Sequence, residues 1–554
     1  MIAVTSVLAQ ATGTSGATPT PISAATKLVV PSVDWVALLP LIILMAGAIV
    51  MITLTSLLRG RFTKSAYAWY TVVVALAAIV ASLPVWARIQ GWTSFLWIDL
   101  VPKQPGASTT LGGAVAVDGF SVFIGIVICA TVIVTALFLG EYLRREDLEG
   151  PEFFVLLLLS ASGGLMMAMA DDLIVLFLGL ETLSIALYVM AAMHLRRAQS
   201  QEAGLKYFVL GAFSSAFFLY GIAMVYGATG STNLVKINAF LSTAVLTKNG
   251  LLMLGFALLL VGFGFKVAAV PFHSWAPDVY DGAPTPATAF MSAAVKAAAF
   301  AGLVRVFMVT FSSFAEDWKP IVYALAVLSM VGGAVLAIVQ TNVKRMLAYS
   351  SISHAGFILV AVAAATERGI QAVLFYVTAY TFMVVGSFAI VSVVGRAGDD
   401  HHTLKDYRGL ARSNPVLSLV FTIFLLAQAG IPFTSGFFAK FYAIIAAVDA
   451  RMYWLGVIAM LAAVVAAFLY LRLIIAMYMS GPEDAEEALP ALGRVRVPFG
   501  AGLAIAICFV VTLGAGIFPS TVLDPARKAT AELVTFTPPA APGLGSGSLS
   551  GQGP

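Results

Sequence analysis

Residues 415–449 read PVLSLVFTIFLLAQAGIPFTSGFFAKFYAIIAAVD, a stretch of 35 residues whose one basic side chain is Lys440. As one continuous helix it would extend about 52 Å, far beyond the roughly 30 Å core of a bilayer. Gly430-Ile431-Pro432 lies near its middle, and proline removes a backbone donor and clashes with the preceding turn. We therefore predict a membrane helix that is broken at this point. Because lipid does not tolerate unpaired backbone groups, the break should face a wet, protein-lined cavity.

A second irregular segment has the same character. Gly262, Gly264 and Lys266 lead into Pro271 at the end of an apolar run. Glycine and proline weaken a helix interior, so we predict a second broken helix here.

Working outward, the composition predicts an all-α polytopic membrane protein. The 554 residues are 60% hydrophobic and only 10% charged, far from the soluble norm. A span takes about 20 apolar residues. We predict fourteen, near 35–58, 67–87, 117–140, 152–170, 172–193, 204–228, 249–270, 284–312, 320–340, 346–366, 369–394, 415–449, 453–480 and 497–519. The two broken helices are the seventh and the twelfth.

The distribution of lysine and arginine predicts the orientation. With the N-terminus outside, fifteen of these residues fall on the cytoplasmic side and ten on the outer side, which places both termini outside. Residues 1–33 carry only Lys27 as a basic side chain, and we expect a flexible outer tail; a weak signal peptide is the alternative, although its basic n-region is missing. The Pro/Gly/Ser-rich residues 535–554 should be disordered.

Six lysines and arginines fall within the predicted spans, and Glu181 joins them nine residues into the fifth span. The basic residues are Lys206, Lys266, Lys296, Arg305, Lys440 and Arg472. The four deepest, Glu181, Lys266, Lys296 and Lys440, would together cost on the order of 10–14 kcal/mol on insertion scales. Such a cost indicates function, although static ion pairs or snorkelling to the interface are alternatives, above all for Lys206 near the end of its span.

Lysine and glutamate suit proton transfer because burial and neighbouring charges move their protonation equilibria. A row of such groups bridged by water is a switchable proton wire. Arginine hardly deprotonates, so we interpret Arg305 and Arg472 as structural. His354, which lies deep in the tenth span among serines, is a candidate relay, with a packing role as the alternative. The loop residues His194, His273, His401 and His402 receive no role.

The spacing of these groups predicts an inverted repeat. Glu181 and Lys266 are 85 residues apart, and His354 and Lys440 are 86 apart. This indicates two five-helix units, 152–312 and 320–480, and an odd number of helices per unit inverts the second one. The remaining regions are 34–116, with the first two spans and an outer loop, 117–151, with the third span and a cytoplasmic loop, and 497–519, the last span.

Composition also excludes several classes of protein. No run of five like charges occurs, so a nucleic-acid partner is not expected. Cys129 and Cys508 both lie in apolar runs, outside any metal-ligand pattern, so the chain should bind no metal or redox cofactor of its own.

Two long motifs carry a family resemblance. Residues 262–286 read GFGFKVAAVPFHSWAPDVYDGAPTP, and residues 341–354 read TNVKRMLAYSSISH. Both resemble signatures of the antiporter-like membrane subunits of respiratory complex I, a likeness that covers roughly 117–480. Asp278-Val279-Tyr280 followed by Gly282-Ala283-Pro284 is most similar to the N-type branch of that family, rather than the L- or M-type branches or the Mrp sodium/proton antiporters.

The resemblance implies a proton-translocating, non-redox subunit of the membrane arm in a bacterial cell membrane. It implies that NADH, FMN, iron–sulfur clusters and quinone belong to partner subunits, and that subunits K and M are the neighbours in the bilayer. It also implies that the family's proton-path residues are Glu181, Lys206, Lys266, Lys296 and Lys440 here. A cation/proton antiporter, an inactive structural spacer, and a subunit of a related hydrogenase or non-NADH dehydrogenase remain alternatives.

Overall fold

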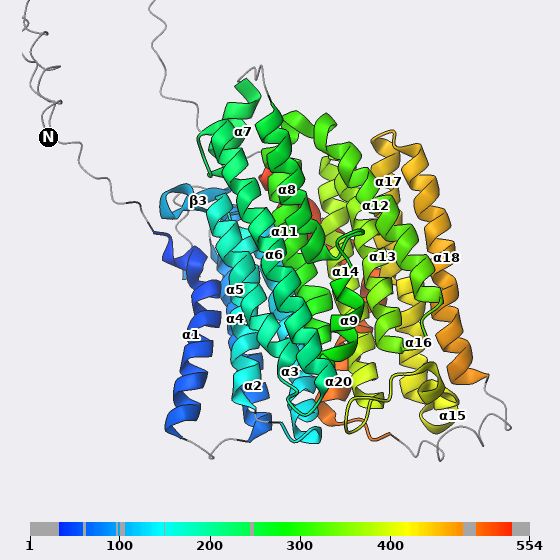
Figure 1. Cartoon of the computed structure of the whole chain (residues 1–554). Helices are drawn as coiled ribbons and strands as arrows, with labels where there is room; N and C mark the ends of the chain where they lie inside the picture. The colour runs from blue at the N-terminus through cyan, green and yellow to red at the C-terminus, as the bar shows by residue number, and fades with distance from the viewer. Residues whose placement is uncertain are drawn as a thin grey trace, which may run out of the picture.

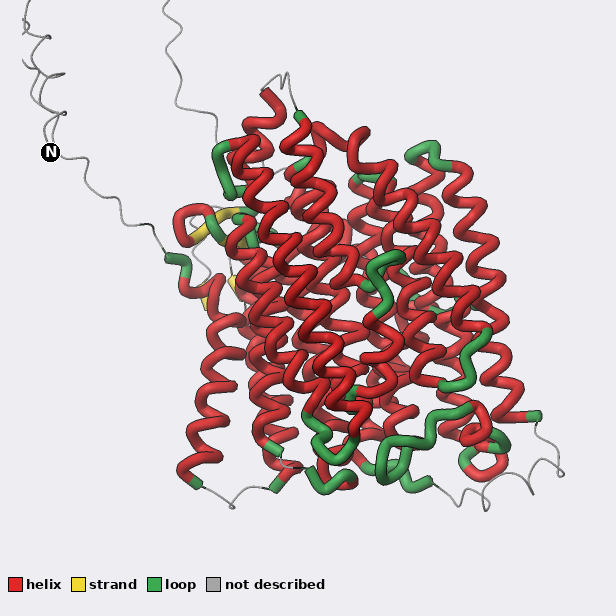
Figure 2. Tube along the Cα trace, in the orientation of Figure 1, coloured by secondary structure: helices red, strands yellow, loops and turns green. Residues whose placement is uncertain are grey.

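The computed structural model describes residues 31, 33–58, 63–92, 94–95, 98–99, 106–148, 150–243, 249–479 and 495–534. The tail predicted at 535–554 and almost all of that predicted at 1–33 lie outside the described residues. The described chain is a bundle of long, roughly parallel and antiparallel helices (Figures 1 and 2).

Thirteen helices in the described part of the chain are long and apolar enough to cross a membrane. They are α1 (Trp35–Leu57), α2 (Lys64–Ile89), α3 (Gly119–Arg145), α4 (Pro151–Met169), α5 (Leu173–Ala192), α6 (Ala198–Thr229), α8 (Gly250–Val267), the composite helix Thr285–Thr310, the composite helix Ser312–Ile338, α13 (Val343–Ala363), α14 (Glu367–Val394), α18 (Tyr453–Tyr478) and α20 (Phe499–Ile517). The all-α polytopic fold predicted from composition is confirmed.

The predicted twelfth span accounts for the difference between fourteen and thirteen. The chain forms α16 (Pro415–Ala429) and α17 (Ser435–Asp449), each of 15 residues and too short to span alone. Gly430 ends α16 with a φ of +90°, in the left-handed region that glycine adopts without strain.

The seventh span is interrupted in another way. The helix α8 ends at Val267, where Ala268 has a φ of +58°, and the chain then passes Pro271 before the short helix α9 (Trp275–Gly282). The eighth span contains α10 (Thr285–Phe290) and α11 (Lys296–Leu303), with π-helical turns at Met291–Val295 (η2) and Val304–Thr310 (η3). π-Turns often occur at functional sites, and the first one directly precedes Lys296.

The smaller elements lie outside the spans. Two antiparallel hairpins pair β1 (Ser94–Phe95) with β2 (Ile98–Asp99) and β3 (Ser108–Thr110) with β4 (Val115–Val117). The short helices are η1 (Leu111–Gly113), α7 (Leu234–Thr243), η5 (Leu404–Tyr407), α15 (Leu410–Ser413) and the final α21 (Ser520–Val534). Within the composite span Ser312–Ile338, the short η4 (Ser312–Phe314) is followed by α12 (Ala315–Ile338). None of the hairpins, α7 or α21 was expected from the sequence.

Burial separates a central group of helices from a peripheral one. All of the apolar stretch of α14 is covered by protein, as is 94% of those of α13 and Thr285–Thr310, against 33% for α18 and 39% for α1. The central helices carry Lys296 and His354. Since a side chain on them cannot reach lipid, their polar groups must be satisfied within the protein.

The two ends of the bundle differ in chemistry. One end, the basic end, carries Arg145, Arg197, Lys344 and Arg345 near the loops. The opposite end, the α7 end, carries the start of α3 and the turn between α4 and α5. There Asp34 pairs with Arg88 at 2.7 Å and Glu532 accepts a hydrogen bond from Gln90 at 2.7 Å, so both ends of the described chain lie at the α7 end.

Candidate functional site

The first half of the predicted row is centred on Lys266, in the last turn of α8. This lysine is 3% exposed, and its Nζ donates to Ser184 Oγ at 2.6 Å. The ammonium also lies 5.7 Å from the ring centre of Tyr188 and 5.3 Å from that of Tyr207, a distance at which aromatic faces stabilise a cation. Lys266 therefore has favourable contacts, but within the described residues it has no counter-ion at bonding distance.

Glu181, on α5, is hydrogen-bonded to a serine and not to this lysine. Its Oε1 accepts a hydrogen bond from Ser215 on α6, and within the described residues no ion pair joins it to Lys266. A cavity of about 10 Å³ is lined by Lys266, by Tyr188 and by Ser215, the residue that donates to Glu181. That volume corresponds to about one water molecule, which can contact both the Lys266 ammonium and the Ser215 hydroxyl.

The middle of the row is Lys296 and His354. Both are 2% exposed. The Lys296 ammonium donates to the backbone carbonyl of Ser351, one turn from His354 on α13, and lies 5.6 Å from the ring centre of Tyr380. The two imidazole nitrogens of His354 contact the hydroxyls of Tyr376 at 2.7 Å and Tyr470 at 3.2 Å.

Lys440 follows the break between α16 and α17. Its Nζ donates to the carbonyls of Gln428 at 3.0 Å and Ala429 at 2.7 Å, the last residues of α16. A helix C-terminus carries partial negative charge, so it favours the lysine in its charged form. The backbone groups freed by the break are thus paired by the side chain that the sequence marked as functional.

A chain of polar groups links His354 to Lys440. Tyr470 contacts Ser350 at 2.5 Å, Ser350 lies 3.4 Å from Gln428 Oε1, and Gln428 also donates to Ser387 at 2.8 Å. Sequence reasoning missed these connecting groups, Tyr376, Tyr470 and Gln428 among them. A single amide or phenol within an apolar span is the signal that could have marked them, because lipid-facing positions seldom carry one.

Lys206 is not part of this buried row. Its Nζ pairs with Glu202 at 2.7 Å and Asp278 at 2.8 Å, and its side chain is 41% exposed. Arg345 holds the other oxygen of Asp278 at 2.7 Å. This placement matches the surface alternative that the sequence left open for Lys206.

The two arginines interpreted as structural contact backbone carbonyls, and Arg305 also pairs with a carboxylate. Arg472 donates to the carbonyls of Ile338 at 2.5 Å and Gln340 at 2.9 Å, at the C-terminus of α12. Arg305 pairs with Asp118 at 2.7 Å and donates to the carbonyl of Ala168.

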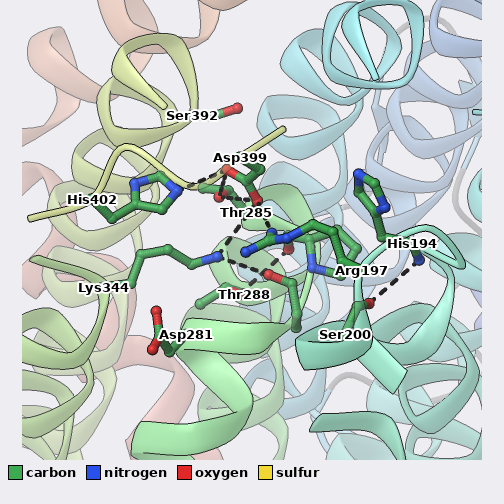
Figure 3. A network of polar contacts seen from close by, with 12 residues as sticks. His194, Arg197, Ser200, Asp281, Thr285, Thr288, Lys344, Ser392, Asp399 and His402 are labelled. Carbon is green, nitrogen blue, oxygen red and sulfur yellow. Dashed lines mark hydrogen bonds and ion pairs between the residues drawn. The ribbon is translucent and has the colours of Figure 1, made fainter. Parts of the chain in front are cut away.

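At the basic end a second polar network surrounds a carboxylate that the sequence did not single out (Figure 3). Asp399 is fully buried in the loop after α14. It contacts His402 at 2.9 Å, Thr285 at 2.8 Å, Tyr142 at 3.1 Å, Arg197 at 3.2 Å and Lys344 at 3.5 Å. Burial alone would raise the pKa of Asp399, but Lys344, His402 and Arg197 outweigh burial and hold the pKa below its usual range.

This network contains side chains to which the sequence gave no role. Lys344, which was counted among the fifteen basic residues of the cytoplasmic side, is fully buried and also donates to the carbonyl of Ala283 at 2.8 Å. His402 and His194, which received no role, both face carboxylates, His402 that of Asp399 and His194 that of Glu146 at 3.5 Å. These partners are far apart in sequence or across a loop, so spacing alone does not reveal them.

In the described residues no group of three or more His, Cys, Asp or Glu side chains could hold a metal ion. The family model described as "NADH:quinone oxidoreductase/Mrp antiporter, TM" matches residues 170–466, more than half of the chain. The chain is 44% identical to the "NADH-quinone oxidoreductase subunit N 1" of Solibacter usitatus, over 77% of this chain and 87% of that protein. The chain belongs to the subunit N family of NADH-quinone oxidoreductase. The resemblance seen in the sequence motifs is thereby confirmed.

Two further comparisons agree with membership of the subunit N family. The chain is 41% identical to "NADH-quinone oxidoreductase subunit N 2" of Koribacter versatilis, over 92% of this chain and 99% of that protein. A chain of respiratory complex I from Thermus thermophilus, solved with bound aureothin, superposes with a TM-score of 0.71 at 31% identity, covering 88% of this chain and all of that one. The region matched by the family model includes Glu181, Lys266, Lys296, His354 and Lys440.

Proposed function

We propose that this chain is a proton-translocating subunit of the membrane arm of a bacterial NADH-quinone oxidoreductase, with no redox centre of its own. NADH, FMN, iron–sulfur clusters and quinone then belong to partner subunits, and subunits K and M are its neighbours in the bilayer. The observation that carries the proposal is the row of three buried lysines with His354. Each contacts hydroxyl, carbonyl or aromatic groups, and none forms an ion pair in the part of the chain that the structure describes.

The geometry suits a row that changes its charge in steps. A buried ammonium without a carboxylate at bonding distance is costly, so small changes nearby can move its proton. Free energy released by the redox reaction in the partner subunits reaches this chain as a conformational or electrostatic change, and that change alters the interaction of Glu181 with Lys266. Lys266 then exchanges its proton with Lys296, and the charge passes by His354 to Lys440.

The proposed orientation places the basic end in the cytoplasm and the α7 end outside. It rests on the excess of lysine and arginine in the loops of the basic end. The two five-helix units remain a proposal: Lys266 lies just before the break after α8, whereas Lys440 lies just after the break that ends α16.

The test compares Lys266→Met with Lys319→Met in the assembled complex in proteoliposomes. Lys319 is a matched control because it is a lysine at the end of a span that pairs with Glu316 at 2.9 Å. We expect Lys266→Met, and also Glu181→Gln, to lower the number of protons pumped per NADH oxidised, and Lys319→Met to leave it unchanged.

Full proton yield in both Lys266→Met and Glu181→Gln would refute the assignment. Transport that depends on sodium and needs no NADH would favour a cation/proton antiporter instead. Replacement of Glu181, Lys266, Lys296 and Lys440 together with no loss of yield would indicate a structural spacer.

A further inference from the structure

Gln428 contacts two members of the lysine row at once. It is the penultimate residue of α16 and is 1% exposed. Its backbone carbonyl accepts a hydrogen bond from Lys440 at 3.0 Å. Its side-chain oxygen Oε1 accepts from Ser350 at 3.4 Å, and Ser350 lies one turn before His354 on α13. The main chain of Gln428 therefore holds the last lysine, and its side chain reaches toward the histidine.

The orientation of the Gln428 amide is fixed by its neighbours. Its Nε2 donates to Ser387 Oγ at 2.8 Å and to the carbonyl of Phe424 at 3.4 Å. The Ser387 hydroxyl spends its own proton on the carbonyl of Met383 at 2.8 Å, so it accepts from Gln428. If the amide were turned over, its oxygen would face the Phe424 carbonyl with no proton between them. Oε1 consequently faces Ser350.

Two hydroxyl groups, which we name the Ser350–Tyr470 bridge, join this oxygen to His354. Ser350 contacts the Tyr470 hydroxyl at 2.5 Å, and that hydroxyl contacts His354 Nε2 at 3.2 Å. On the other side of the ring, Nδ1 contacts the Tyr376 hydroxyl at 2.7 Å. All five side chains are at most 2% exposed. Each hydroxyl has one proton to donate, so the direction of one hydrogen bond sets the direction of the next.

Two directions of these bonds are possible. In the forward direction Tyr376 donates to Nδ1, Nε2–H donates to Tyr470, and the bridge donates to Gln428. Every group then has a partner. In the reverse direction Nδ1–H donates to Tyr376, and within the described residues the Tyr376 proton has no acceptor and Gln428 Oε1 has no donor. Two unsatisfied buried groups disfavour the reverse direction. His354 is therefore neutral and carries its proton on Nε2.

We propose that Gln428 is a positioning residue that selects the tautomer of His354 through the Ser350–Tyr470 bridge, so that Nδ1 is the atom that takes up the proton delivered by the row. The inference rests on the proposed function and deepens it by naming the accepting atom. On uptake a bond forms between the proton and Nδ1, and the lysine that gives the proton is left as a neutral amine. The Tyr376 hydroxyl turns so that its oxygen accepts from the new N–H.

Removing one link should make the two directions equally favourable. In Gln428→Leu each direction leaves one unsatisfied proton, that of Ser350 in the forward direction and that of Tyr376 in the reverse direction. In Ser350→Ala the Tyr470 proton takes the place of the Ser350 proton, and Gln428 Oε1 is unsatisfied in both directions. The double variant has the same balance, so the two substitutions should not add.

The test measures the tautomer and proton transport in the assembled complex. Infrared spectra of complexes with ¹³C-ring-labelled histidine distinguish the two tautomers, and subtraction of the spectrum of His354→Gln isolates the bands of His354. Protons pumped per NADH oxidised are measured in proteoliposomes. Ser353→Ala is the matched control for Ser350→Ala, because Ser353 is a buried serine of the same helix whose hydroxyl donates to the carbonyl of Met330 at 3.2 Å, outside the bridge.

We expect the parent and Ser353→Ala to show the Nε2–H tautomer alone and the same proton yield. Gln428→Leu, Ser350→Ala and the double variant should each show both tautomers. With half of the molecules in the competent form, their proton yield should fall by up to about twofold.

A single Nε2–H tautomer in both Gln428→Leu and Ser350→Ala would overturn the inference, and so would the Nδ1–H tautomer in the parent. Both tautomers with a full proton yield would overturn it as well, because the choice of nitrogen would then not matter for transport. A loss of yield in Lys266→Met beside any of these results would leave the proposed function standing. If Gln428→Leu does not assemble, Ser350→Ala, which removes one oxygen atom, decides the question by itself.

Discussion

Two buried aspartates at opposite ends of the bundle have opposite environments. Asp399, at the basic end, is fully buried and has five side chains around its two oxygens (Figure 3). Asp171, at the α7 end, is 6% exposed and has an oxygen with no partner among the described residues. Lysine and histidine lower the pKa of Asp399, whereas burial raises that of Asp171 to about 7.

Burial alone therefore does not decide whether a carboxyl group stays ionised or changes its protonation. Asp399 is fixed as an anion, and it joins α3, the loop before α6, the eighth span and α13 to the loop after α14. We interpret it as a structural clamp that holds the helices around the lysine row. Asp171 is free to change its protonation, which suits exchange with water. The following substitutions test that contrast, beginning with the one that should change stability most.

Asp399→Asn should have the largest effect on stability. It leaves Lys344, fully buried, without its carboxylate and also removes the charge that Arg197 faces. Breaking a buried pair by removing one partner costs about 3–5 kcal/mol. The measurement is thermal denaturation of the purified complex together with the amount of assembled complex in the membrane. A variant as stable as the parent would contradict the clamp.

Asp171→Asn should change how stability depends on pH. The pKa of Asp171 is about 7 when folded and about 3.9 in an unfolded chain, so the folded state binds the proton more tightly. The parent then loses at most about 4 kcal/mol of stability as the pH rises from about 4 to about 7, and the loss persists above that range.

The asparagine variant lacks this dependence, so it should be more stable than the parent at pH 8 relative to pH 5. Denaturation midpoints of both complexes across that range check the sign. Identical pH profiles would place the pKa of Asp171 near its ordinary value and remove the contrast with Asp399.

Thr285→Val should have an intermediate effect. Its hydroxyl donates to Asp399 at 2.8 Å, and a hydrogen bond to a charged group contributes about 1.5–3 kcal/mol. Thr285→Ser is the control, since it keeps the hydroxyl. Denaturation should separate the two variants, and equal midpoints would mean that the remaining donors satisfy Asp399 without Thr285.

Asp172→Asn should have the smallest effect. Asparagine caps a helix about as well as aspartate, so we expect a change within about 0.5 kcal/mol. Its denaturation midpoint, measured with that of Asp171→Asn, checks that the response belongs to the buried carboxyl group. A large loss in Asp172→Asn would instead indicate that the whole turn between α4 and α5 is sensitive.

Much of the fold could be predicted because the bilayer restricts it. Apolar runs of the required length predicted fourteen spans, and thirteen of them correspond to helices in the described residues that are long enough to cross a membrane. The fourteenth, 415–449, forms α16 and α17, and its length and proline had marked it as broken. The hairpins near β3 and the helices α7 and α21 were missed, since these elements lie outside the spans, where hydropathy carries little information.

The candidate site was predicted in part. Lys266, Lys296, His354 and Lys440 stand out in the sequence because charged or ionisable groups are rare in apolar spans, and all four are buried. Lys206 stood out for the same reason but pairs with Glu202 and Asp278 near the surface. Position within a span does not tell whether a long side chain reaches a partner outside it.

Residue types and their positions in the chain suffice to predict a membrane protein with a row of costly intramembrane charges, because an unpaired charge in hydrocarbon has a cost set by its residue type and depth. Which carboxyl group is clamped and which has an unpaired oxygen follows from the packing of the helices. The donors around Asp399 come from five separate segments. Among the described residues Asp171 Oδ2 has no partner, and this depends on where Arg305 and α7 pack. Contacts between distant segments set the protonation of a buried group, and no local pattern of residues records them.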